Sequence, residues 1–136
     1  MLELAVQGNP AFRASGLELN RLGPSYSVDT VLEVMQDRPN DTLFFLTGVD
    51  AAALLPTWHR AEEFVRLVHT AALARPGYTL GDLGSSFRGR VQTLNTRLCD
   101  VSSTEIRTRL SRRESVRYLV PEAVERYLDR TALYRE

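Results

Sequence analysis

The residues best suited to hold a charged group lie in the stretch VSSTEIR at positions 101–107. Ser102 and Glu105 have the spacing of a capping box, which predicts that a helix begins here. The first turn of a helix has unpaired N–H groups and a partial positive charge, so it can hold a phosphate. Arg107, one turn further on, would reach the same anion with its guanidinium. The alternative is a capped helix without a ligand.

A second helix start is predicted at Ser27, after the turn at Gly23 and Pro24. Asp29 falls in its first turn, where the helix dipole favours a carboxylate. Such a start can also receive the carboxylate of a ligand, whereas the alternative is again a plain helix cap. The apolar stripe that would face the core recurs at the helical period and consists of Val28, Val31, Leu32 and Met35.

A third group of candidate residues follows two predicted strands. Gly48 and Asp50 come after the first strand and Arg75 comes after the second. Ligands of open α/β sheets bind at the carboxyl ends of parallel strands, and a glycine there lets a ligand approach the backbone. Trp58 is an aromatic residue that would either stack on a ligand or serve as a core or lid residue.

The elements that position these residues are those of an α/β fold with a parallel sheet. The apolar run at 42–48 is typical of a strand buried on both faces, and 68–74 predicts a second one. A helix at about 60–67 between them makes a βαβ unit. A further strand is expected within 91–101. The outer parts of the chain are expected to hold a helix in 1–7, short extended pieces at 12–15 and 17–20, and helices at 103–111 and 121–130.

Composition excludes several chemistries. All 17 basic residues are arginine, which removes Schiff-base lysines and the lysine of a Walker A loop. The single cysteine, Cys99, excludes an internal disulfide and a multi-cysteine zinc site. No apolar run approaches the ~18 residues that cross a bilayer, and the first residues lack a basic leader region, so a cytoplasmic protein is expected.

Charge is distributed unevenly although the formal net charge is zero. Residues 69–136 contain 12 arginines and 8 acids, which makes this half the better place for an anion. The alternative is that most of these arginines are solvated. Nucleic-acid binding is disfavoured because the arginines are not interleaved with stacking aromatics.

These motifs together resemble the bacterial nicotinate-nucleotide adenylyltransferases of the nucleotidyltransferase superfamily. VSSTEIR is similar to the ISSTxIR signature of the superfamily, and GPSYSVDT at 23–30 looks like the family's GPSYTVDT. FLTGVD at 45–50 resembles FxxGxD, LPTWHR at 55–60 resembles LPxWxxW, and RPGY at 75–78 matches as it stands. SVRYLVP at 115–121 is similar to a stretch that we interpret as packing. The match runs from Met1 to Tyr134 in the family's order and weakens over about 79–97.

The resemblance implies a Rossmann-like nucleotidyltransferase fold and transfer of AMP from ATP to nicotinate mononucleotide, giving nicotinate adenine dinucleotide and pyrophosphate with Mg²⁺. Trp58 would stack on the nicotinate ring, Asp50 would contact the ribose side, and the backbones of Ser27 and His59 would hold the carboxylate. Residues implied to bind ATP are Ser102, Ser103, Thr104 and Arg107. Residues implied to bind the acceptor are Tyr26, Ser27, Gly48, Asp50, Trp58, His59 and Arg75. No residue is assigned as a metal ligand.

The family's opening strand, Gly-rich turn and helix, with the motif GxFDPxHxGH, do not occur in these 136 residues. His59 and His69 do not match its histidines, and His69 is interpreted as structural. No catalytic residue is therefore assigned. We expect an N-terminally shortened member, a single partial domain over 1–136, either because Met1 is an internal methionine or because the gene is truncated. Weak or absent turnover is the corresponding expectation, since the missing loop stabilises the transition state.

Two other functions remain open at this point. One is a non-catalytic nucleotide-binding or interaction module. The other is an adenylyltransferase for a different acceptor, nicotinamide mononucleotide or phosphopantetheine, against which Trp58 and the GPSY stretch argue.

Overall fold

The computed structural model describes residues 1–75, 77, 79–81, 86–97 and 100–135. The chain divides into a sheet unit, Leu17–Asp100, and a helical unit, Met1–Gly16 with Val101–Glu136. The prediction that 1–136 form one domain stays a prediction. The sheet unit contains η1 (Leu17–Asn20), α2 (Ser27–Asp37), β1 (Phe44–Gly48), α3 (Val49–Ala53), η2 (Leu55–Thr57), α4 (Ala61–Leu67), β2 (His69–Leu73) and β3 (Val91–Leu94). The helical unit contains α1 (Leu2–Val6), α5 (Ser103–Ser111) and α6 (Glu122–Thr131).

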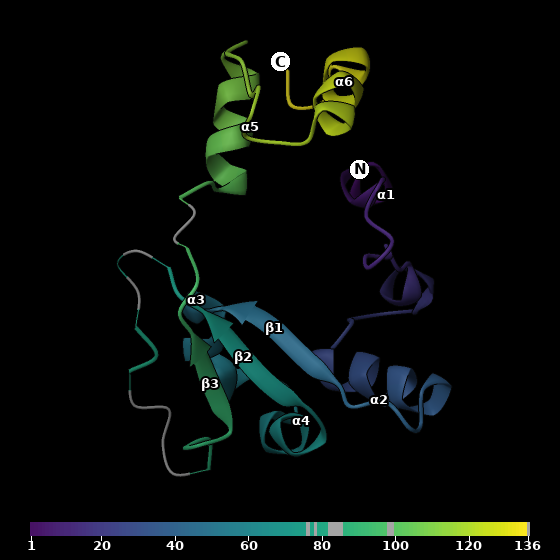
Figure 1. Cartoon of the computed structure of the whole chain (residues 1–136), viewed down its shortest axis with the longest axis vertical. Helices are drawn as coiled ribbons and strands as arrows, with labels where there is room; N and C mark the ends of the chain where they lie inside the picture. Colours follow the sequence, from purple (N-terminus) through teal and green to yellow (C-terminus); the bar gives the residue numbers. More distant parts are fainter. Residues whose placement is uncertain (76, 78, 82–85, 98–99, 136) are drawn as a thin grey trace. The chain divides into compact units, whose positions relative to one another are not determined.

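The sheet is parallel and has the order β1-β2-β3 (Figure 1). Gly48, the last residue of β1, is paired with Leu73, the last residue of β2, and Leu73 is paired with Leu94 at the end of β3. The three carboxyl ends therefore lie at one edge. This confirms the predicted α/β fold with a parallel sheet and brings the residues after β1 and β2 close together.

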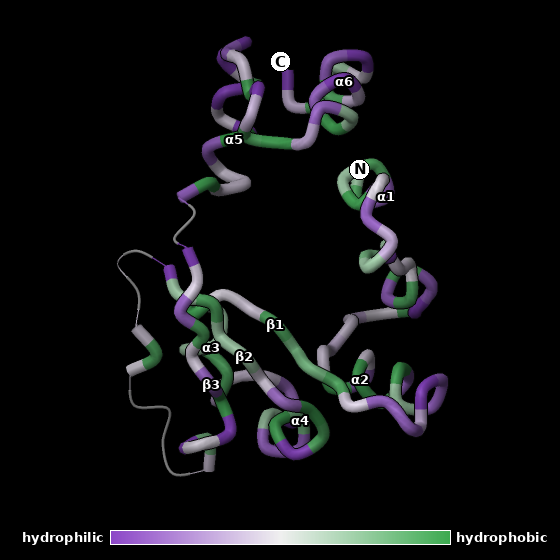
Figure 2. Tube along the Cα trace, viewed as in Figure 1, coloured by the Kyte–Doolittle hydropathy of each residue, from purple (hydrophilic) through white to green (hydrophobic). Residues whose placement is uncertain are grey.

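One face of the sheet is covered by helices. The centre of this core is Phe64 of α4, which is 1% exposed, together with Leu55 of η2 and Val28 of α2. Each such side chain contributes about 1.5–3 kcal/mol by leaving water. In Figure 2, α4 contains both hydrophobic and hydrophilic residues, as expected for a helix with one apolar side and one polar side. The start of α2 and the start of α4 are thus held against a common core.

The prediction that the first strand is buried on both faces is wrong. Phe44 and Leu46 are 66% and 61% exposed, while Phe45 between them packs against the core. Successive side chains of a strand point to opposite faces, so the two exposed residues share the face away from α4. A continuous apolar run predicts the strand correctly but does not determine how many of its faces are covered.

The expected extended piece at 17–20 is also wrong, because these residues form the 3₁₀ helix η1. The Arg21 N–H donates to the Glu18 carbonyl, and the Glu18 carboxylate accepts a hydrogen bond from the Thr30 hydroxyl at 2.6 Å. The alternation of leucine with polar residues over four positions is too short to separate a strand from a turn of helix. Residues 12–15 form no strand.

The helical unit has a small core of its own. Leu110 of α5 and Leu128 of α6 are buried together with Val116 and Val124, and Leu4 of α1 packs against them. The predicted helix at 103–111 is confirmed at both ends, and the helix predicted from Pro121 begins one residue later, at Glu122.

Among the described residues, no helix is long and apolar enough to cross a membrane.

Candidate functional site

The start of α2 and the segment before α4 meet through two aromatic rings. Tyr26 caps α2, and its ring stacks on that of His59 with the centroids 4.1 Å apart and the planes 26° apart. Both side chains are exposed, so the stack lies at the surface of the sheet unit. Two of the predicted acceptor-binding segments, 33 residues apart in the sequence, are therefore adjacent in space.

The backbone at the start of α2 supports the predicted carboxylate site. The Tyr26 carbonyl accepts hydrogen bonds from the N–H groups of Asp29 and Thr30, at 3.0 and 3.2 Å. Tyr26 makes no side-chain capping bond, and Ser27 is the first helical residue rather than the cap. The N–H groups of Ser27 and Val28 precede those that the helix uses and carry its partial positive charge.

Trp58, next to His59, is half-buried. Its indole lies against Phe45, with centroids 5.9 Å apart and planes at 81°, and against Phe64 at 5.5 Å. Trp58 is thus packed against the core, as the core interpretation predicts, and it is not fully buried. Stacking on a ligand ring stays a prediction.

Gly48, Asp50 and Arg75 are brought together at the carboxyl edge of the sheet, as predicted. The Asp50 carboxylate in the first turn of α3 pairs with the Arg75 guanidinium, with Oδ2 and Nη1 2.7 Å apart. A Cβ at position 48 would lie 2.4 Å from the Asp50 Oδ1, so glycine is what permits this placement of the carboxylate. Pro76 and Tyr78 of the RPGY motif lie outside the described residues, as does Cys99.

The phosphate-binding candidates lie at the start of α5 in the helical unit. The Ser102 Oγ accepts a hydrogen bond from the Glu105 N–H at 3.1 Å, which confirms the cap. The Glu105 carboxylate accepts a hydrogen bond from Arg109 on the next turn, at 2.9 Å. Arg107 donates to the Thr104 hydroxyl at 3.4 Å. A hollow of about 180 Å³ here is lined by residues that include Ser103, Arg107 and Tyr134. Binding of a phosphate by these groups stays a prediction.

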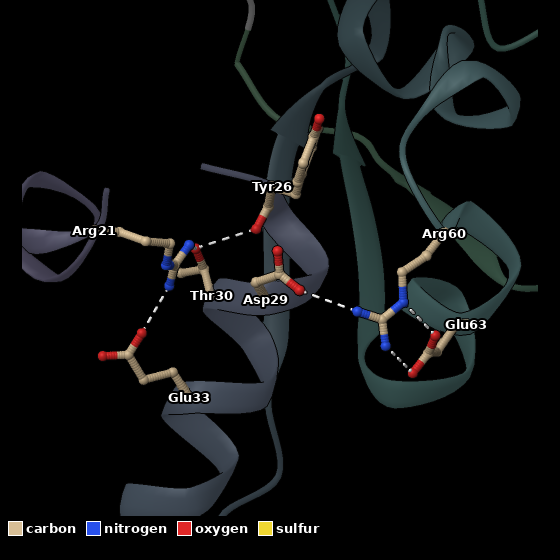
Figure 3. Close-up of polar contacts among 7 residues, drawn as sticks. All are labelled: Arg21, Tyr26, Asp29, Thr30, Glu33, Arg60 and Glu63. Atoms are coloured by element: carbon tan, nitrogen blue, oxygen red, sulfur yellow. Dashed lines mark hydrogen bonds and ion pairs between the residues drawn. The ribbon is translucent and has the colours of Figure 1, made fainter. Parts of the chain in front are cut away.

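Arg60 is a residue of this region for which the sequence analysis predicts no role. Its guanidinium donates two hydrogen bonds to Glu63, both 2.8 Å, and one to Asp29 at 3.0 Å (Figure 3). The hydrogen bonds with Glu63 raise the pKa of Arg60 and lower that of Glu63. The spacing of Arg60 and Glu63 is a helical signal that could have revealed the first contact. No local signal reveals the contact with Asp29, which lies 31 residues away.

A second arginine holds the other side of α2. Arg21 donates to the Thr30 hydroxyl at 3.1 Å and pairs with Glu33 at 2.7 Å (Figure 3). Together with the Glu18–Thr30 hydrogen bond, these contacts fix the segment that leads into α2.

The part of the chain that the structure describes has no group of three or more His, Cys, Asp or Glu residues placed to hold a metal ion.

Comparisons with known proteins agree with the motifs. The sequence model of the cytidylyltransferase-like family matches residues 1–109. A probable nicotinate-nucleotide adenylyltransferase of Streptomyces coelicolor is 40% identical over 135 residues, which are 99% of this chain and 71% of that protein. One from Thermus thermophilus is 45% identical over 135 residues, covering 99% of this chain and 70% of that protein.

A likeness to a solved structure supports the fold. The Plasmodium falciparum nicotinic acid mononucleotide adenylyltransferase complexed with APC superimposes with a TM-score of 0.64 over 83% of this chain and 60% of that one. Its sequence identity is 17%, so it bears on the fold alone. The Rossmann-like nucleotidyltransferase fold implied by the motifs is confirmed.

Proposed function

Because this chain belongs to the nicotinate-nucleotide adenylyltransferase family of cytidylyltransferase-like proteins, we propose that it binds nicotinate mononucleotide and transfers the adenylyl group of ATP to it. The product would be nicotinate adenine dinucleotide, a step of NAD biosynthesis. The observation that carries this proposal is the Tyr26–His59 stack, because it joins the start of α2 to the segment of Trp58.

The proposed acceptor site uses one kind of group for each part of the mononucleotide. The N–H groups at Ser27 and the backbone of His59 receive the carboxylate, since a helix start favours an anion. The Trp58 ring stacks on the pyridine ring. Asp50 accepts a hydrogen bond from the ribose, and Arg75, paired with it at 2.7 Å, holds it in place.

The proposed reaction is a displacement at phosphorus. A phosphate oxygen of the acceptor forms a bond to the α-phosphorus of ATP, the bond from that phosphorus to the bridging oxygen breaks, and pyrophosphate leaves. The nucleophile is already an anion, so catalysis rests on positioning and charge stabilisation and not on a general base. Ser102, Ser103, Thr104 and Arg107 would bind the ATP phosphates.

Mg²⁺ is proposed to arrive with ATP, coordinated by the phosphates, where it would neutralise the charge of the leaving pyrophosphate. The groups proposed to hold the ATP phosphates beside it are the start of α5 and the Arg107 guanidinium. The reaction is expected to take place in the cytoplasm.

Fluorescence of Trp58, the single tryptophan, tests acceptor binding directly. Titration with nicotinate mononucleotide should change the emission saturably, while nicotinamide mononucleotide, which lacks the carboxylate, should bind more weakly. Calorimetry on Trp58→Ala should show a loss of affinity for the acid. Equal affinity for the two mononucleotides, or no saturable binding of either, would refute the proposed acceptor.

Product analysis tests the transfer. With ATP, Mg²⁺ and nicotinate mononucleotide, any turnover should yield nicotinate adenine dinucleotide and pyrophosphate in equal amounts. Because weak or absent turnover is expected of these 136 residues, binding without formation of the dinucleotide would support a non-catalytic nucleotide-binding module only if a chain that also carries the GxFDPxHxGH segment forms no dinucleotide either.

A further inference from the structure

Arg60 lies where the two acceptor-binding segments meet. It directly follows His59 and precedes α4, and its three hydrogen bonds run in two directions (Figure 3). Two of them reach Glu63 in the first turn of α4, and the third reaches Asp29 in the first turn of α2. One side chain therefore ties together the starts of two helices.

These contacts form a closed circuit of four residues, which we call the Arg60 circuit. Arg60 donates to Asp29, the Asp29 N–H donates to the Tyr26 carbonyl at 3.0 Å, the Tyr26 ring stacks on His59, and His59 is covalently joined to Arg60. A change at Arg60 is thus passed both along the backbone to His59 and through Asp29 to Tyr26. Both members of the Tyr26–His59 stack are therefore linked to the Arg60 side chain.

The backbone conformation at Arg60 does not itself favour arginine at this position. Its φ of 52° and ψ of 41° are left-handed, a conformation that glycine adopts more easily than arginine. A residue kept under such strain by its surroundings is a reason to look for a function in its side chain. The Arg60 guanidinium offers such a function, because it donates hydrogen bonds to both Asp29 and Glu63.

The contacts of Arg60 are too exposed to matter much for the stability of the whole protein. The Arg60, Asp29 and Glu63 side chains are between 37% and 40% exposed, and ion pairs of this kind are screened by water. Their effect is therefore on local orientation, which separates this role from that of a core residue.

We infer that Arg60 is a positioning residue for the acceptor site. Through its contact with Asp29 it keeps the Tyr26 ring stacked on the His59 ring. This inference rests on the proposed function for its ligand, but the geometry it describes exists without the ligand. Replacing Arg60 should loosen the stack and weaken mononucleotide binding without lowering stability.

Arg60→Gly is the decisive variant, because it removes the guanidinium and relieves the left-handed backbone at once. Arg113→Gly is a matched control: Arg113 is also an exposed arginine with positive φ, 60°, but lies after α5 in the helical unit. Arg60→Lys keeps the positive charge but loses the branched guanidinium, so its loss of mononucleotide affinity should be smaller than that of Arg60→Gly. Asp29→Asn should act in the same direction as Arg60→Gly.

The first measurement uses proton NMR without ligand, since the chain has only two histidines. The His59 ring proton, assigned with His59→Asn, should be shifted upfield by Tyr26 and should move toward the position of a free histidine in Arg60→Gly. It should stay in place in Arg113→Gly. The His69 signal serves as an internal reference, because His69 stacks on Phe44 and lies outside the Arg60 circuit.

The second measurement is the dissociation constant for nicotinate mononucleotide, read by Trp58 fluorescence, with the thermal midpoint recorded alongside. Arg60→Gly should raise the constant by about 10-fold, since misplaced binding groups cost up to ~10²-fold, while its midpoint stays the same or rises. Arg113→Gly should leave the constant unchanged.

The two measurements test the proposed function and the role of Arg60 independently of each other. If the unchanged protein does not bind the mononucleotide, the proposed function fails while the NMR result still decides whether Arg60 positions the stack. An unmoved His59 signal in Arg60→Gly overturns the inference. A lower midpoint together with a displaced His69 signal also overturns it, because that result marks a general structural role.

Discussion

Replacing Gly48 with alanine is expected to weaken acceptor binding while leaving the protein almost as stable as before. The φ of −70° and ψ of 150° at Gly48 suit alanine, so the backbone itself does not resist the change. The new Cβ would lie 2.4 Å from the Asp50 Oδ1, whereas ordinary contact begins at 3.4 Å. The carboxylate must therefore move by about 1 Å and give up its contact with Arg75.

The size of each effect follows from this displacement. A binding group misplaced by about 1 Å costs on the order of 10- to 100-fold, which is the expected rise of the dissociation constant for nicotinate mononucleotide. The Asp50 and Arg75 side chains are 33% and 38% exposed, so their lost ion pair costs about 1 kcal/mol of stability at most. Alanine returns about 0.4–1 kcal/mol by restricting the unfolded chain, so the net change in unfolding free energy is small.

The assay is a cycle of variants, with Trp58 fluorescence for affinity and urea unfolding for stability. In an Asp50→Ala background there is no carboxylate to displace, so Gly48→Ala should not weaken binding further and should add about 0.4–1 kcal/mol of stability. Equal weakening in both backgrounds, or an unchanged dissociation constant in Gly48→Ala alone, would refute the reasoning.

Further predictions concern the core, the ends of α5 and the Arg60 circuit. Phe64→Ala should lower the unfolding free energy by about 3–5 kcal/mol in urea titrations, because removal of this buried ring, which contacts two other rings, would leave a cavity. Ser102→Ala should lower the thermal midpoint, with a cost of about 1 kcal/mol for the lost cap. Arg113→Gly should raise the midpoint by relieving a left-handed residue, worth about 1 kcal/mol. The Glu63 carboxyl, followed by carbon NMR, should titrate below the usual glutamate pKa of about 4.3.

Each of these outcomes has a clear contrary. A Phe64→Ala variant within about 1 kcal/mol of the unchanged protein would contradict the assigned core. A midpoint lowered by Arg113→Gly would contradict the hydrogen-bonded turn in which its N–H donates to Leu110 and that of Glu114 donates to Arg109. For Glu63, the lowered pKa means that its contact with Arg60 is fully present above pH ~4.3 and is lost as the pH falls through the folded-state pKa. Titration at the usual pKa would show that this contact is absent in solution.

The sequence alone was enough for the features that neighbouring residues decide. The helix starts at Ser27 and Ser103, the cap by Ser102 and the two strands that end before Asp50 and Arg75 were all predicted correctly. Caps, helical stripes and apolar runs depend on residues within about four positions of one another, so they can be recognised in a single sequence. The parallel arrangement then follows from the strand–helix–strand order, and it brings Asp50 and Arg75 together.

Only the tertiary structure decided which distant surfaces meet. The Arg60–Asp29 contact and the Tyr26–His59 stack join segments about 30 residues apart, and no pattern in either segment marks the partner. The prediction for the exposed face of β1 is wrong for the same reason, since Phe44 and Leu46 look no different from the half-buried Phe45 in a run of apolar residues. Burial and long-range pairing depend on how whole elements pack, and that packing is set by the summed contacts of the fold and not by any single stretch of the chain.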